Sequence, residues 1–240
     1  MREGFLNAVF GAAAAVAFTV TVAPTPNAVA ITSIEAIEQT IAEQTNAYRQ
    51  REGLKPLLRD ERLQKAANAY AHFMARTGQY GHKVDGQTPA QRVGQAGYDH
   101  CIVRENIAFV EFPGNPTAKE IAARLLSGWI SSTGHRKNLK ARYVTGLGIG
   151  VARSDAKGLS RGAWRYYAVQ VFAKPIADAF RFAVRNTRGQ PVEYTVDSKS
   201  FTLPPNTTHK HLQCSPPLIK TTVLGEQRTY KPKSGETIDL

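Results

Sequence analysis

The sequence predicts an α+β fold, in which helices cover a sheet, followed by a small all-β module. Two observations predict this class. Four predicted helices lie between residues 33 and 131, and three of them have apolar residues at helical spacing. Segments rich in β-branched and aromatic residues follow, beginning with 144–152 and 164–172. A run of helices before a run of strands is typical of α+β layering.

Each predicted helix carries its own start signal. Ser33 and Asp60 are the expected N-caps of the first two helices, Thr88-Pro89 begins the third with proline at the favoured first position, and the fourth begins at Thr117. The predicted helices cover residues 33–52, a second segment from 60 to about 78, a short third one closed by Gly97, and 117–131. Glycines 53, 78 and 97 stand where three of these helices should stop, since glycine tolerates the left-handed backbone of a helix end.

The strand segments fall into two groups. Residues 144–152 and 164–172 are expected to pair as an antiparallel hairpin. Lys174-Pro175 then marks a boundary, so we expect one main domain over residues 31–175 and a β module over 176–240. The module's candidate strands are 180–184, 192–196, 200–203, 207–212 and 218–223.

The N-terminus predicts export. Residues 8–23 form an alanine-rich apolar run after Arg2, prolines break it, and the small-residue site Ala28-Val29-Ala30 follows. This pattern is typical of a secretory signal peptide, here residues 1–30, with the mature chain starting near Ile31. An uncleaved anchor is the alternative. No other segment is long and apolar enough to cross a membrane. We therefore expect a secreted protein, periplasmic or extracellular.

Export affects how the two cysteines are interpreted. Cys101 and Cys214 are the only cysteines of the chain, and a disulfide persists in the oxidising environment outside the cytoplasm. We expect a bridge between them that ties a late segment to an earlier one. The alternative is two unpaired buried thiols.

The formal net charge of +12 suggests anionic partners. Nucleic acid is not expected, because the lysines and arginines are scattered and no nucleic-acid motif occurs. A lipid or an anionic envelope polymer is the partner that a basic exported protein meets first. A charged surface that only maintains solubility is the alternative.

Three segments carry residues suited to chemistry. They contain His82 on a glycine-flanked loop, Glu105 inside an apolar run, and His135 on a turn after the fourth helix. None matches a zinc-protease pattern, a nucleophile elbow or a phosphate loop. Taken alone, each is more often a structural residue than a functional one. His100, His209 and His211 have no partner pattern, and no role is assigned to them.

Together, the ordered motifs resemble a known family. The chain contains GHKVDGQTPAQRVGQAGY, RENIA, GWISSTGHRKNL, GLGIGVA and WRYYAVQVF in that order. They resemble the CAP superfamily of cysteine-rich secretory, antigen 5 and pathogenesis-related-1 proteins, in its bacterial secreted branch. The resemblance covers about residues 41–172. It implies an α–β–α sandwich with a central cleft.

The resemblance also implies a set of cleft residues. In the family two histidines and two glutamates line the cleft and can hold a divalent metal. Here His82 and His135 match the histidines and Glu105 matches the first glutamate. Ser132 stands where the second glutamate is usual, which leaves a His–His–carboxylate set. Asn106 and Asn138 flank this set and, with Ser132, are expected to support it.

Such a set suits zinc, because two imidazoles and a carboxylate leave a fourth position for water. The leading hypothesis is a secreted binding module whose cleft holds a ligand, lipid-like or envelope-associated, with or without the metal. A metal-assisted hydrolase of peptide or envelope polymer, with Glu105 as the candidate base, is the second. The third is a structural envelope protein without metal, in which Glu105 and the two histidines satisfy one another.

Overall fold

The computed structural model describes residues 1, 4, 32–154, 163–223 and 225–240. Apart from residues 1 and 4, the predicted signal peptide lies outside the described residues. Five α-helices are described, and four of them are those predicted. They are α1 (Ile34–Arg51), α2 (Glu61–Thr77), α3 (Pro89–Gln95), α4 (Ala118–Ser131) and α5 (Thr133–Leu139).

The predicted capping residues begin and end the helices as expected. Ser33 and Asp60 accept hydrogen bonds from backbone amides of the first turns of α1 and α2. Thr88 and Thr117 form complete capping boxes at α3 and α4. Gly78 closes α2 in the left-handed conformation, with φ of 71°. Local sequence therefore determines where these helices begin and end.

One four-stranded sheet forms the centre of the main domain. Its strands are β1 (Leu58–Arg59), β2 (His100–Pro113), β3 (Gly146–Ser154) and β4 (Ala163–Pro175), in the order β1-β3-β4-β2. The predicted hairpin is confirmed, since β3 and β4 pair antiparallel. Strand β2, which carries Glu105, is a long edge strand antiparallel to β4. It was not predicted as a strand.

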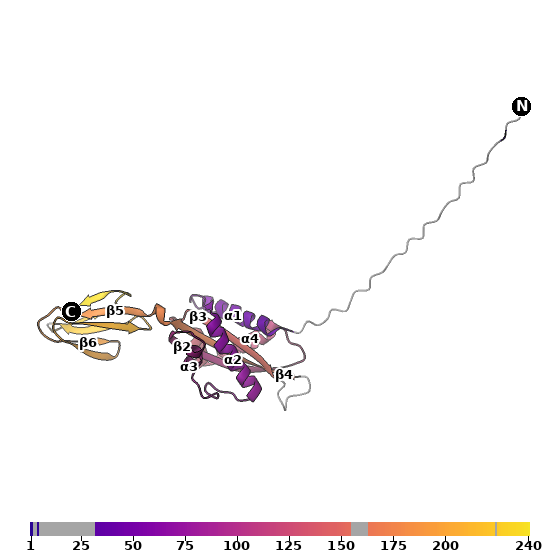
Figure 1. The fold of residues 1–240 in the computed structure, drawn as a ribbon, viewed down its shortest axis with the longest axis horizontal. Coiled ribbons are helices and arrows are strands. Elements are labelled where there is room, and N and C mark those ends of the chain that lie inside the picture. Colours follow the sequence, from indigo (N-terminus) through magenta and orange to yellow (C-terminus); the bar gives the residue numbers. More distant parts are fainter. Residues whose placement is uncertain (2–3, 5–31, 155–162, 224) are drawn as a thin grey trace. The chain divides into compact units, whose positions relative to one another are not determined.

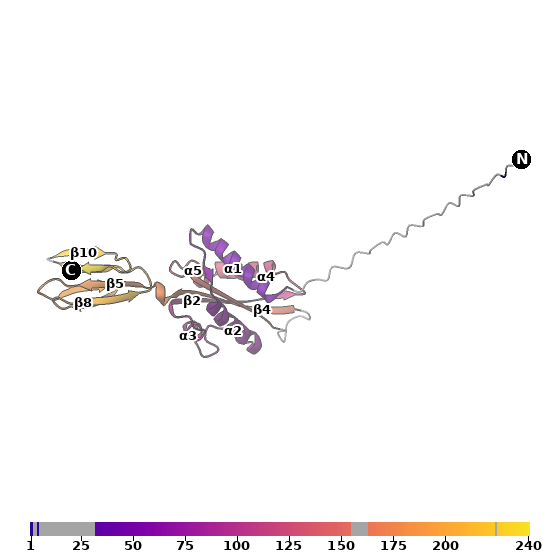
Figure 2. The same cartoon turned by 45° about the horizontal axis from the view of Figure 1, so that its top comes forward.

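Helices cover both faces of this sheet. Figure 2 shows α1, α4 and α5 on one face and α2 and α3 on the other, and Figure 1 shows the same domain from a view turned by 45°. Each face has its own apolar core. Trp129 and Phe172 are fully buried in the first core, and Tyr70 and Met74 lie in the second. The predicted α–β–α sandwich is confirmed.

Two glycines of β3 bring α2 close to the sheet. A Cβ atom added at Gly148 or Gly150 would overlap main-chain atoms of Leu63 and Ala67, which lie on α2. Any larger residue at these positions forces the helix away from the strand. The glycines in GLGIGVA are thus packing residues, and they determine how α2 lies on the sheet.

Among the described residues after 175, the regular structure is β-strand apart from one 3₁₀ turn, Ile176–Asp178. Strands β10, β9, β6 and β7 form one sheet, and β11, β5 and β8 form another. All pairs are antiparallel except β11 with β5. The bounds are β5 (Phe180–Arg185), β6 (Val192–Val196), β7 (Lys199–Leu203), β8 (Thr208–Gln213), β9 (Ile219–Val223), β10 (Glu226–Tyr230) and β11 (Thr237–Asp239).

Both C-terminal sheets contribute to one apolar core, which includes Phe182 and Ile238 from one sheet and Tyr194 and Leu203 from the other. The five predicted strands are present within one or two residues of their expected bounds. The last two strands, β10 and β11, were not predicted. The expected domain boundary near Pro175 stays a prediction.

The predicted disulfide is confirmed. Cys101 and Cys214 are bonded with their Cα atoms 5.4 Å apart and a sequence separation of 113. Lys174 Nζ donates a hydrogen bond to the main-chain oxygen of Cys214 at 3.0 Å. The alternative of two unpaired thiols is wrong. Among the described residues, no helix has the length and apolar character needed to span a membrane.

Candidate functional site

His82 and Glu105 come together although they are 23 residues apart in sequence. His82 lies in the turn between α2 and α3, and Glu105 lies on β2. His82 Nδ1 is 2.8 Å from Glu105 Oε1. The carboxylate is almost completely buried, whereas about half of the imidazole side chain is exposed. The bond therefore holds the Nδ1 side of the ring and leaves Nε2 free of the carboxylate.

Arg92 of α3 occupies the other side of the same carboxylate. Its Nη2 donates to Glu105 Oε2 at 2.8 Å, and its Nη1 donates to Asp85 Oδ1 at 2.9 Å. It also donates to the main-chain oxygens of His82 and Gln87. One buried guanidinium thus fixes both the carboxylate and the loop that carries the histidine.

The ring of Tyr70 supports this guanidinium. The Arg92 Cζ atom lies 3.5 Å from the Tyr70 ring centroid, a cation–π contact. The Tyr70 hydroxyl donates to the main-chain oxygen of Gly81, next to His82. Asp85, predicted as a simple turn residue, accepts from the Gln87 amide as a turn residue does and also pairs with Arg92. The loop is therefore held at several points.

Amide side chains join the main chain of His135 to strand β2. It lies in the short helix α5, which the sequence predicted only as a turn. Asn106 is fully buried and donates to the main-chain oxygen of His135 at 3.2 Å. Asn138 donates to Asn106 Oδ1 and to the main-chain oxygen of Glu105. These two asparagines join α5 to the strand that carries the carboxylate.

Gln170 on β4 extends this network into the core. Asn106 Nδ2 also donates to Gln170 Oε1 at 3.1 Å, and Gln170 Nε2 donates to Thr45 Oγ1 on α1 at 2.7 Å. These three side chains are buried, so each polar atom needs its partner. The network ties α5, β2, β4 and α1 together beneath the site.

The environment of the His135 imidazole shifts its pKa. Burial lowers the pKa of His135, and the neighbouring His82 lowers it further. His135 is partly buried, and no hydrogen bond among the described residues joins its ring to Glu105. A lowered pKa keeps the ring neutral at neutral pH, the form in which imidazole nitrogen binds metal.

The three predicted ligands are therefore not equivalent. Both oxygens of Glu105 are engaged, one by His82 and one by Arg92. Within residues 32–154, 163–223 and 225–240, no group of three or more His, Cys, Asp and Glu side chains is arranged to hold a metal. The donors that fit a metal are the two imidazoles, with Glu105 as the outer partner of His82. This arrangement, carboxylate to histidine to metal, is common around zinc.

Ser132 has a different position from the asparagines. It lies between α4 and α5, and its main chain begins α5 by accepting from the Arg136 amide at 2.8 Å. Its hydroxyl makes no capping hydrogen bond. A supporting role for its side chain stays a prediction.

Sequence reasoning missed Arg92, Tyr70 and Gln170. Arg92 and Gln170 are polar residues inside otherwise regular elements, and both are buried. The signal available in the sequence was weak. Arg92 stands next to the buried Val93 in α3, and Gln170 interrupts the apolar strand YYAVQVF. A polar residue in such a strand suggests a buried hydrogen-bond partner.

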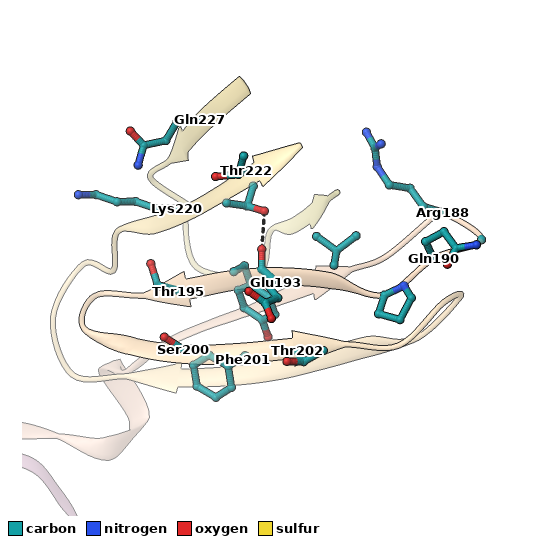
Figure 3. A pocket seen from close by; sticks show the side chains of 15 residues that line it. Arg188, Gln190, Glu193, Thr195, Ser200, Phe201, Thr202, Lys220, Thr222 and Gln227 are labelled. Atoms are coloured by element: carbon teal, nitrogen blue, oxygen red, sulfur yellow. Dashed lines mark hydrogen bonds between the residues drawn. The ribbon is translucent and has the colours of Figure 1, made fainter. Parts of the chain in front are cut away.

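A separate groove lies in the C-terminal region. It has a volume of about 770 Å³ and runs over strands β6, β7, β9 and β10. Figure 3 shows Thr195, Ser200, Lys220 and Thr222 along it, with Arg188 at one end. Its lining is rich in hydroxyls and amides, and it contains none of the predicted site residues.

A sandwich of this kind, with His82, Glu105 and His135 at one edge of its sheet, defines a CAP-type domain. The family model described as the cysteine-rich secretory protein family matches residues 42–172, more than half of the chain. The chain therefore belongs to the CAP family.

Individual relatives are bacterial. An uncharacterized protein, YkwD of Bacillus subtilis (strain 168), is 34% identical over 125 residues, which are 52% of this chain and 46% of that protein. The chain thus spans about half the length of this curated relative. An extracellular SCP-domain protein from Bacillus anthracis str. Ames is 26% identical, with a TM-score of 0.46, over 58% of this chain and 41% of that one. An outer surface protein from Borrelia burgdorferi is 20% identical, with a TM-score of 0.47, over 61% of this chain and 98% of that one.

Proposed function

We propose that this chain is an exported CAP protein that binds a divalent metal ion, zinc by preference, between His82 and His135 and uses that site to hold a ligand. The observation that carries the proposal is the 2.8 Å bond from His82 Nδ1 to the buried Glu105 carboxylate. It orients the ring, and it favours the tautomer whose Nε2 is unprotonated and can coordinate. Bound metal would supply a Lewis acid with positions open to water or ligand.

Glu105 orients His82 in this proposal and does not itself bind the metal or act as a base. Arg92 binds the second oxygen of Glu105, and the Glu105 side chain is only 2% exposed. A general base must reach a water or substrate proton, and this carboxylate has no free oxygen directed to solvent. Binding is therefore favoured over the hydrolase alternative.

Zinc binding by single-residue variants tests the site. The purified chain is equilibrated with zinc, and bound metal is measured by mass spectrometry and calorimetry. His82→Ala and His135→Ala should each lose the site. Glu105→Gln should bind roughly 10- to 100-fold more weakly, the usual cost of losing an outer partner. His72→Ala, an exposed histidine on α2, is the matched control and should bind like the wild type. Equal zinc uptake by all four variants would contradict the proposal.

Export is part of the same proposal. The predicted signal peptide and the Cys101–Cys214 bridge support it, because disulfides are rare in proteins that stay in a reducing compartment. Intact mass of the chain recovered from periplasm or medium should correspond to a start near Ile31, with two hydrogens fewer than the dithiol form. A full-length mass with two alkylatable thiols would contradict it.

The polar groove favours an anionic envelope polymer over a lipid as the partner. Hydroxyls, the amides of Gln190 and Gln227, and the cations Arg188 and Lys220 line it beside one carboxylate, Glu193. Hydroxyls, amides and cations pair with hydroxyls and anionic groups better than with acyl chains. Lys220→Glu should weaken co-sedimentation with a purified anionic wall polymer, while Lys65→Glu, remote in the sequence on α2, should not. If the chain binds lipid vesicles as well as it binds the polymer, and Lys220→Glu does not weaken that binding, a lipid is favoured as the partner.

A further inference from the structure

Three aromatic side chains from the two C-terminal sheets converge on one another. Tyr194 lies on β6, and His209 and His211 lie on β8. The Tyr194 hydroxyl oxygen is 3.0 Å from His209 Nδ1 and 2.7 Å from His211 Nε2. Residues two apart on a strand face the same side, so both imidazoles point at one oxygen from the other sheet.

The geometry suits coordination. A transition metal lies about 2.0–2.1 Å from imidazole nitrogen, so neighbouring donors around it are roughly 3 Å apart. The two nitrogen-to-oxygen distances, 3.0 and 2.7 Å, are those of hydrogen bonds in the structure, and they are also close to this spacing. The donor set is two imidazoles and one phenol oxygen, which differs from sets built only of His, Cys, Asp and Glu.

The surroundings hold the rings in place and leave a way in. Phe182 stacks on His211 with ring centroids 5.0 Å apart, and Phe201 lies edge-on to the same ring at 5.0 Å. Both histidines are partly exposed, while Tyr194 is buried. His211 also lines a cavity of about 370 Å³ beside Phe182 and Leu212. The two imidazoles are therefore partly open to solvent, and His211 also borders this cavity.

We propose that Tyr194, His209 and His211 form a second metal site, separate from the CAP cleft and selective for Cu(II). Imidazole donors suit copper, and Cu(II) is the tightest-binding ion of the first-row divalent series. Coordination of the phenol oxygen requires that its proton leave to solvent; the ion's charge favours the phenolate, against the burial that raises the pKa of Tyr194 to about 12.

The test is a Cu(II) titration of the full chain purified without a histidine tag. The background is the His82→Ala/His135→Ala double variant, which silences the cleft, so the result does not depend on the function proposed above. One saturable Cu(II) site is expected, with a phenolate-to-copper absorption band in the visible. Zn(II) should bind more weakly.

Variants of the three donors decide the assignment. His209→Ala and His211→Ala should weaken Cu(II) binding by more than the roughly 10- to 100-fold that loss of an outer partner costs. Tyr194→Phe should abolish the visible band. His100→Ala is the control and should change nothing. His211→Gln, which keeps a polar side chain of similar size, guards against misfolding, and near-UV circular dichroism reports the fold of each variant.

The proposal is overturned if the double-variant background takes up no stoichiometric Cu(II). It is also overturned if correctly folded His211→Gln binds Cu(II) as tightly as the background. A visible band that persists in Tyr194→Phe contradicts the assignment of the phenol oxygen as a ligand.

Discussion

Replacing Arg92 by leucine should destabilise the fold more than any exposed charge change. Arg92 is 8% exposed and donates four hydrogen bonds, to Asp85, Gln87, His82 and Glu105. Leucine keeps the apolar bulk but removes every donor. The Glu105 carboxylate then stays buried with His82 as its one remaining side-chain partner among the described residues.

The burial of the Arg92–Glu105 ion pair determines how much stability Arg92→Leu should lose. Removing one partner of a buried ion pair costs about 3–5 kcal/mol, because the remaining charge is neither hydrated nor paired. The Glu105 and Arg92 side chains are only 2% and 7% exposed, so solvent screens their interaction little. We therefore expect Arg92→Leu to lower the free energy of unfolding by about this amount.

Urea unfolding followed by circular dichroism measures this change. The control is Arg185→Ala, which removes an ion pair to Asp239 whose partners are about half exposed, and it should change stability little. The double variant Arg92→Leu/Glu105→Leu should recover part of the loss, since both charges are gone. If Arg92→Leu costs no more than Arg185→Ala, the interpretation of Arg92 as the residue that holds the site is wrong.

Three further changes test other parts of the fold. Cys101→Ser/Cys214→Ser should lower the unfolding free energy by about 2–5 kcal/mol, because the bridge closes a long loop. A fall in the urea midpoint no larger than that of a surface substitution would contradict this. Gly150→Ala should cost about 1–3 kcal/mol through overlap with the α2 main chain, while Gly189→Ala, with open space around it, should cost little in the same urea assay. Burial raises the pKa of Glu38 above 4.5, so its contribution to stability is full at low pH and is lost as pH rises above that value. Urea unfolding of both proteins should therefore show the wild type losing stability relative to Glu38→Gln as the pH rises. A difference in unfolding free energy that stays constant with pH would contradict this prediction.

The sequence predicted the elements whose signals are local. Caps and stop glycines act within one turn of a helix, so the bounds of α1, α2, α3 and α4 were predictable. The hairpin of β3 and β4 was predictable for the same reason. The helix α5 has only seven residues, too few for a periodic pattern to distinguish it from a turn.

Elements that depend on tertiary partners were missed. Strand β2 carries Arg104, Glu105 and Asn106 in succession, and these polar residues break the alternation expected of a strand. They are tolerated because α3 and α5 supply partners on the two faces. In β10 four of five residues are exposed, so no apolar pattern marked it.

In the candidate site too, residues marked by local motifs were predictable and residues that depend on tertiary partners were not. The order of motifs led to His82, Glu105 and His135, but it could not show that Arg92 occupies the second oxygen of the carboxylate. Burial of an arginine depends on partners that only the folded chain brings together. For this reason Glu105 was predicted as a ligand or base, whereas its contacts favour an orienting role.

A crystal structure of the chain grown with zinc, recorded at the zinc absorption edge, tests the central claim most directly. The account predicts one anomalous peak within bonding distance of His82 Nε2 and a ring nitrogen of His135, with Glu105 still bonded to His82 Nδ1. Imidazoles directed away from a common point, with no peak between them, would contradict it.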